Sequence, residues 1–249
     1  MLTALAAAFL LSAPQGEPPL LAVIDPGHGG EQSGARAPDG FYEKDVALSI
    51  ARRLAARLAR QGGRAVLTRT GDISVPLANR AALANAERAD LFISIHLNSM
   101  ATRRKRAVTQ GVETYFLSAD ASDASATAVA ARENADRLAG EPEVDPNDPV
   151  AGILRDLQST EALAGSSRLA YAIHERLVKE CGAEDRGVKQ APFYVLAGAS
   201  MPAVLVEVGF ISHRVESRRL RSGAYQEKVA KAIADAVAAW RANGRHAMK

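Results

Sequence analysis

Four ionisable side chains stand at positions in the sequence where a sheet edge would bring them together. His28 and His96 each follow a short apolar run, Glu207 interrupts a third, and Glu43 begins the amphipathic stretch after the His28 turn. In an open α/β sheet, ligands bind beyond the carboxyl ends of the strands, where the loops converge. We therefore expect these four groups to meet at one edge of a sheet.

The types of these residues indicate metal-assisted hydrolysis. Two imidazoles and a carboxylate form the ligand set of a hydrolytic zinc site, which leaves a fourth position open. A second carboxylate within hydrogen-bond reach can take a proton from water and return it to a leaving amine. Glu207 fits that role, because an unpartnered carboxylate on an apolar strand would be costly to bury. A histidine in a glycine turn can also be a plain turn residue, so the prediction rests on the set.

Two other kinds of site are excluded. Cys181 is the single cysteine of the 249 residues, so the chain can form neither an internal disulfide nor a thiolate zinc cluster. The glycines at 27, 29 and 30 lack both the P-loop lysine and the spacing of a dinucleotide fingerprint. Nucleotide binding is therefore not expected.

Strands alternate with helices along most of the chain, which predicts an α/β fold with a mostly parallel sheet and helices on both faces. Amphipathic helices are indicated by apolar residues that recur every three to four positions. The expected strands are 20–25, 64–69, 91–95, 111–117 and 203–208, and the expected helices include 43–61, one opened by Pro76, 166–181 and a last one holding Val229 to Trp240.

The alternation is interrupted between residues 118 and 165. This stretch holds an alanine-rich helix, an acidic and proline-rich part at 141–149, and a short amphipathic piece around Ile153. Insertions of this length in compact domains are often lids or regulatory elements. We interpret 21–243 as a single catalytic domain and 118–165 as an inserted regulatory segment.

Several motifs resemble one enzyme family. They are Leu-Ala-Val-Ile-Asp-Pro-Gly-His-Gly-Gly at 21–30, the helix start at Glu43, Asn79-Arg80, Ala-Asp-Leu-Phe-Ile-Ser-Ile-His-Leu-Asn at 89–98, Gly-Val-Glu-Thr-Tyr-Phe at 111–116, and Val-Glu-Val-Gly-Phe-Ile-Ser at 206–212. Together they resemble the zinc-dependent N-acetylmuramoyl-L-alanine amidases of the cell-separation type. The resemblance implies hydrolysis of the amide between the lactyl group of N-acetylmuramic acid and L-alanine in peptidoglycan. It also implies His28, Glu43 and His96 as Zn²⁺ ligands and Glu207 as the catalytic acid/base.

The insertion resembles the segment that covers the zinc in division-associated members until a partner protein displaces it. This implies autoinhibition and a protein activator that displaces residues 118–165. We hypothesise that an acidic residue of the segment occupies the open zinc position at rest. The candidates are Glu133, Glu141 and Glu143.

Other polar residues are weaker candidates. Arg80 and Asn98 are expected to bind substrate, although Arg80 could equally pair with a carboxylate. The basic run 103–106 is most simply a solvated loop, and its functional alternative is contact with stem-peptide carboxylates or an acidic partner. His174 is expected at the surface.

Two other functions remain open at this stage. Another zinc hydrolase of the cell wall, a carboxypeptidase or a deacetylase, could use the same ligands, and the products would separate them. A non-catalytic wall-binding module is the second alternative, and the presence of Glu207 argues against it.

Composition and the first residues suggest where the protein works. A net charge of +3 and a pI near 9.1 slightly favour anionic partners such as a wall polymer, but are too weak to indicate nucleic acid. Residues 1–20 include an apolar run of the length of a signal-peptide core, too short for a stable membrane span. We expect an exported monomer in the periplasm or cell envelope.

Overall fold

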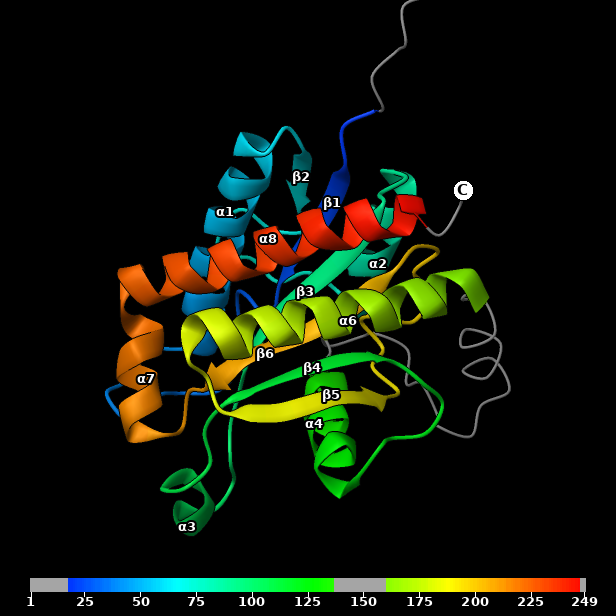
Figure 1. Cartoon of the computed structure of the whole chain (residues 1–249). Coiled ribbons are helices and arrows are strands. Elements are labelled where there is room, and N and C mark those ends of the chain that lie inside the picture. Colours follow the sequence, from blue (N-terminus) through cyan, green and yellow to red (C-terminus); the bar gives the residue numbers. More distant parts are fainter. Residues whose placement is uncertain (1–17, 137–159, 247–249) are drawn as a thin grey trace, which may run out of the picture.

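A single six-stranded sheet runs through the computed structural model, which describes residues 18–136 and 160–246 (Figure 1). The strand order is β2-β1-β3-β6-β4-β5. Strands β1, β2, β3 and β6 are parallel, whereas β4 runs antiparallel to β6 and β5 runs parallel to β4. The prediction of a mostly parallel α/β sheet is confirmed. The strands are β1 Leu21–Pro26, β2 Arg64–Leu67, β3 Leu91–Asn98, β4 Val112–Leu117, β5 Asp185–Ala191 and β6 Ala203–Phe210.

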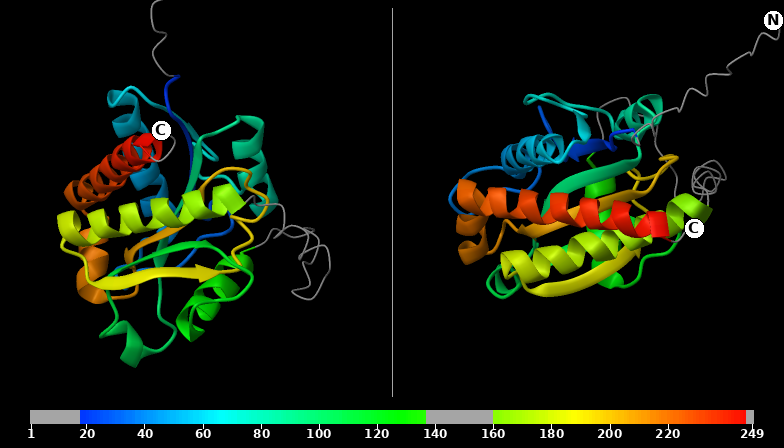
Figure 2. Two further views of the ribbon diagram at one scale, coloured as in Figure 1. Left: turned by 45° about the vertical axis from the view of Figure 1, so that its right-hand side comes forward. Right: turned by 45° about the horizontal axis from the view of Figure 1, so that its top comes forward.

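Three long helices cover one face of the sheet: α1 (Glu43–Arg60), α6 (Thr160–Cys181) and α8 (Gly223–His246) (Figure 2). Their apolar stripes pack into one core with the sheet, which is the burial that the helical spacing predicts. The other face carries α2 (Leu77–Ala86) and α4 (Ala124–Asn134), which share a second core with β4 and β6. Two short helices, α3 (Arg103–Arg106) and α7 (Arg214–Arg221), follow β3 and β6.

Helix α1 shows why the elements form where the sequence predicts them. Val46, Ile50, Leu54 and Leu58 are buried along one stripe. Acidic residues lie in its first turn and arginines in its last, which matches the partial charges of the helix ends. The helix ends at Arg60, one residue before the predicted boundary, where Gly62 and Gly63 follow.

Helix α6 differs from its prediction at the start. It begins at Thr160 rather than Ser166, so its first turns belong to the segment predicted as an insertion. The first turns bury small residues, Ala162 and Gly165, instead of the large apolar side chains that mark a periodic stripe. A Cβ on Gly165 would lie 2.6 Å from Pro202, so this end of the helix packs closely through glycine.

Strand β5 is absent from the sequence prediction. Its residues, Asp185–Ala191, are mostly polar and only partly buried, because β5 is the edge strand beside β4. A polar edge strand lacks the apolar run that identifies the buried strands.

The expectation that His174 lies at the surface is wrong. The side chain lies on the buried face of α6, with Nε2 2.8 Å from Asp185 Oδ1 and Nδ1 3.3 Å from Thr114 Oγ1. It follows Ile173 at the margin of the apolar stripe, where a polar residue can be buried if tertiary partners satisfy both ring nitrogens.

Among the described residues, no helix combines the length and apolarity needed to cross a bilayer.

Candidate metal centre

The loop after β1 holds His28 in an unusual backbone conformation. His28 has a φ of 58°, in the left-handed region that non-glycine residues seldom adopt. Two buried arginines fix the loop from below. Arg69 donates to the carbonyl oxygens of Pro26 and Gly27 at 3.0 and 2.8 Å. Arg80 donates to those of Pro26 and His28, both at 3.1 Å, and so helps to hold the strained residue in place.

Gly27 allows the two histidines to approach each other. A Cβ at this position would lie 2.4 Å from the His96 ring, closer than any side chain could tolerate. With glycine there, the His28 and His96 rings lie with their centroids 4.8 Å apart. The glycine-rich turn therefore provides room for a second imidazole.

Glu43, the first residue of α1, joins the two rings. Its Oε1 lies 2.9 Å from His28 Nε2 and 3.2 Å from His96 Nδ1, and both carboxylate oxygens also accept backbone hydrogen bonds, from Leu97 N and Ala35 N. Burial alone would raise the pKa of Glu43. The charge of His28 and hydrogen bonds from both histidines outweigh burial and hold that pKa well below its usual value.

Glu133, near the end of α4, completes the cluster. Its Oε2 lies 2.9 Å from His96 Nδ1 and 3.4 Å from His28 Nε2. One ligand atom from each of His28, Glu43, His96 and Glu133 lies within 4.8 Å of the others, and all four side chains are buried. The structure thus brings three of the predicted residues together with one of the predicted regulatory acids.

The donor atoms in this cluster fit a metal ion. His28 Nε2, His96 Nδ1 and Glu133 Oε2 are buried and make no hydrogen bond of good geometry, although they face one another. Buried polar atoms without partners are costly, and a shared cation would satisfy all three. The acids of the cluster also favour the protonated form of His96. Burial lowers the pKa of His96, but the charge of Glu133 and the close contacts with Glu133 and Glu43 raise it to about 9.

Glu207 lies beside the cluster. On β6 it pairs in register with His96 on β3, so the two side chains share a face of the sheet. Glu207 is fully buried, its Oε1 lies 3.3 Å from Arg132 Nη2, and its Oε2 has no hydrogen-bond partner. Burial and the charge of Glu133 raise the pKa of Glu207 well above its usual value, while Arg132 opposes that shift.

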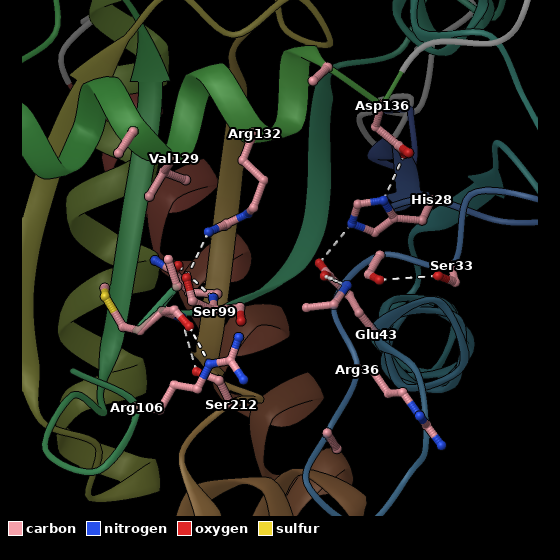
Figure 3. A pocket seen from close by; sticks show the side chains of 18 of the residues that line it. His28, Ser33, Arg36, Glu43, Ser99, Arg106, Val129, Arg132, Asp136 and Ser212 are labelled. Carbon is pink, nitrogen blue, oxygen red and sulfur yellow. Dashed lines mark hydrogen bonds and ion pairs between the residues drawn. The ribbon is translucent and has the colours of Figure 1, made fainter. Parts of the chain in front are cut away.

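A cavity of about 1250 Å³ opens onto these residues (Figure 3). His28 and Glu43 line it, together with the loops 31–38 and 98–106 and the face of α4 that carries Arg132. Through His28 and Glu43 the cluster therefore borders the cavity, whose lining does not include His96 or Glu133.

Known proteins match this chain over nearly its whole length. The family model for N-acetylmuramoyl-L-alanine amidase matches residues 22–239. The chain belongs to this family. It is 39% identical over 219 residues to the amidase AmiA of Salmonella typhimurium, covering 87% of this chain and 74% of that protein, and 39% identical over 217 residues to AmiA of Escherichia coli, covering 86% and 74%. The structure of the amidase AmiC2 of Nostoc punctiforme superposes with a TM-score of 0.68 at 32% identity, covering 90% of this chain and 98% of that one.

The resemblance inferred from the sequence is thereby confirmed. The protein is a metal-dependent amidase that acts on peptidoglycan, and its relatives indicate a place in the cell envelope. The buried histidine and glutamate cluster has the composition and spacing to hold the metal of this amidase.

The two residues predicted to bind substrate have different surroundings in the amidase. The Arg80 guanidinium is buried and pairs with Asp25 at 2.9 Å, which is the carboxylate-pairing alternative. Asn98 lines the cavity, but its Nδ2 donates to Glu113 Oε2 at 2.5 Å and its Oδ1 accepts from Ser99 N. The Arg80 guanidinium thus pairs with Asp25 and supports the His28 loop, and substrate binding by Arg80 and Asn98 stays a prediction.

Three further residues of the amidase site were missed from the sequence. Asp136 Oδ2 lies 2.7 Å from His28 Nδ1, and Arg132 contacts both Glu133 and Glu207. Glu113 is fully buried opposite Glu207, on β4. Glu113 had a signal, because it is a carboxylate in an apolar strand like Glu207. Arg132 and Asp136 had none beyond their charge.

Glu141 and Glu143, the other two acids suggested for the open metal position, lie outside the residues that the structure describes, as does the amphipathic piece around Ile153.

Proposed function

We propose that the amidase binds Zn²⁺ through His28, Glu43 and His96 and uses Glu207 to hydrolyse the bond between the lactyl group of N-acetylmuramic acid and L-alanine. The observation that carries the proposal is the convergence of two imidazole nitrogens and a carboxylate oxygen beside a cavity that His28 and Glu43 line. This donor set is the one that hydrolytic zinc sites use.

The chemistry divides between the ion and the chain. Bound zinc would supply Lewis acidity, which polarises the amide carbonyl and lowers the pKa of water from about 15.7 to about 7. Glu207 would accept the proton of the attacking water on its free Oε2 and pass it to the departing L-alanine amine. Glu43 would stay ionised as a ligand, because its two backbone hydrogen bonds favour the charged form.

Glu133 would block the site at rest. Its Oε2 faces both imidazoles, in the position that an open ligand site would present to substrate. Arg132, the preceding residue, forms an ion pair with Glu207 and so engages the proposed acid/base as well. These contacts support the autoinhibition inferred from the sequence. Displacement of the 118–165 segment by a protein activator would free both the metal-binding cluster and Glu207.

The decisive test is digestion of purified sacculi by the wild-type chain and by Glu207→Gln. Mass spectrometry should find peptides that begin with a free L-alanine amine and glycan strands that remain intact. The variant should retain its metal and lose at least about a hundredfold in rate, since general acid–base groups contribute at least that much. Release of acetate would identify a deacetylase, and loss of C-terminal D-alanine a carboxypeptidase.

Autoinhibition has its own experiment. Deleting the inserted regulatory segment, residues 118–165, would remove Glu133 but also the first turns of α6. A shorter deletion of residues 121–157 is therefore the better design. The deletion variant should hydrolyse sacculi faster than the intact chain. A binding module without catalysis would bind the sacculi in both forms and release nothing.

Export is also a proposal. The apolar run within residues 1–20 and the envelope location of the family both support a signal peptide there. Comparison of the N-terminus of the protein from whole cells with that of the encoded chain would show whether the run is removed.

A further inference from the structure

Three cations line the cavity without an acidic partner. Arg36 lies on the loop before α1, and Lys105 and Arg106 lie on α3. All three are exposed, and none of them forms an ion pair with any residue in the ranges 18–136 and 160–246. The fourth cavity-lining cation, Arg132, is different, since Glu133 and Glu207 already neutralise it.

The wall that carries Lys105 and Arg106 is held in place. Met100 N donates to Ser212 Oγ at 3.0 Å, and Ser99 O accepts from Arg132, so the loop after β3 is tied to β6 and to α4. Arg106 Nε donates to Met100 O at 2.6 Å, which directs the guanidinium along the cavity wall (Figure 3). Within residues 18–136 and 160–246, the terminal nitrogens of Arg106 make no hydrogen bond that would compete with a ligand.

Among the described residues, the few acids that line the cavity do not compensate these three cations. Glu31 is the exposed acid that lines the cavity, and Asp136 is engaged with His28. Exposed like charges placed together without counter-ions cost stability, which a binding role would explain.

We propose that Lys105 and Arg106, with Arg36 across the cavity, bind a free carboxylate of the peptidoglycan stem peptide and so select acidic stems over amidated ones. This inference rests on the proposed function, because that function places the stem peptide in the cavity. The stem offers the α-carboxylate of its D-glutamate, next to the L-alanine, and the carboxylate at its C-terminus, which belongs to the third residue in a tripeptide. Guanidinium and carboxylate groups form charge-assisted, often bidentate hydrogen bonds.

The same basic run contains its own control. Arg103 and Arg104 are as exposed as Arg106 but do not line the cavity. Removing one of these charges changes the net charge equally, while leaving the cavity wall intact. Arg103→Gln therefore separates a local contact from a general electrostatic attraction.

The test measures binding of three muramyl tripeptides to the full chain carrying Glu207→Gln, which prevents turnover. One has both carboxylates free, one has D-isoglutamine at the second position, and one has its terminal carboxylate amidated. Adding Arg106→Gln should raise Kd for the fully acidic peptide by about tenfold, the scale of a hydrogen bond to a charged group. The amidated peptide that escapes this loss identifies the carboxylate that is bound.

Equal losses for all three peptides, or equal effects of Arg103→Gln and Arg106→Gln, would overturn the proposal. Binding decides it even if neither the wild-type chain nor the 121–157 deletion cleaves the peptides, an outcome that would instead count against the proposed function. Unchanged thermal unfolding of both variants confirms that the fold is intact.

Discussion

The two faces of the sheet are packed in different ways. On one face, α6 and α8 bury large apolar side chains such as Leu169, Ile173, Leu177 and Val229 in the main core. On the other, α4 buries only Ala126, Val129 and Ala130 in the second core. Buried apolar area stabilises in proportion to its extent, so α4 contributes far less hydrophobic free energy than α6 or α8.

Polar contacts replace apolar area at the end of α4. Asn134 donates to Pro192 O at 2.7 Å and accepts from Tyr194 N at 2.8 Å, and Asp123 caps the start of the helix. Such contacts fix a geometry but contribute little net free energy against water. The comparison indicates that α6 and α8 contribute most of the apolar packing, whereas α4, the helix that carries Glu133, is held by few apolar contacts.

The largest expected effect tests the well-packed face. Leu177→Ala should lower the free energy of unfolding by about 3 kcal/mol, because it leaves a cavity in the main core between α6 and the sheet. Chemical denaturation of the metal-free protein measures this. A loss below about 1 kcal/mol would mean that this face is no more tightly packed than the other.

Sequence alone predicts the well-packed face better than the other. Apolar runs and helical spacing identify β1, β3, β6 and α1, since burial there follows from the residue types themselves. Strand β5 and the polar contacts of α4 depend on partners far away in the chain, which no local pattern encodes. His28, Glu43, His96 and Glu207 could be named because strand ends bring them together, whereas Glu133 could be named only as one of three acids.

The second prediction concerns pH at the site itself. In the metal-free protein the pKa of His96 is raised to about 9, above its value of about 6.5 in an unfolded chain. Its stabilising contribution is therefore complete below pH 6.5 and is lost as pH rises through 9. Zinc must displace that proton, so its Kd should fall about fiftyfold between pH 7 and pH 9.

Competition with a chelator of known affinity measures this Kd at each pH. Glu161→Ala, which removes an exposed acid on α6 away from the site, should bind zinc with the same pH dependence as the wild-type chain. A Kd that does not change with pH would mean that the histidines carry no proton to displace.

The third prediction tests whether Glu133 on α4 blocks the site. Glu133→Ala should retain zinc and hydrolyse sacculi about tenfold faster, because the closed state loses about 1.4 kcal/mol of its preference. The variant distinguishes a blocking group from a required ligand. If Glu133→Ala lost both its zinc and its activity, Glu133 would belong to the permanent ligand set.

The smallest expected effect is that of Val129→Ala. It removes part of the small apolar contact of α4 and should cost at most about 1 kcal/mol, mostly through local opening of the helix. Hydrogen exchange should quicken in α4 and stay unchanged in α6 and α8. Faster exchange in all three helices would show that the two faces unfold as one unit.

The reversed direction of β4 gives α4 a particular mechanical character. Because β4 runs antiparallel to β6, with Glu113 opposite Glu207, the chain leaves β4 at the sheet edge away from the metal and must return along α4 to place Glu133 there. An 11-residue helix spans about 16 Å. If the proposed autoinhibition holds, a partner protein would have a point of contact at the start of α4, remote from the cluster, from which it would displace Glu133 without entering the cavity.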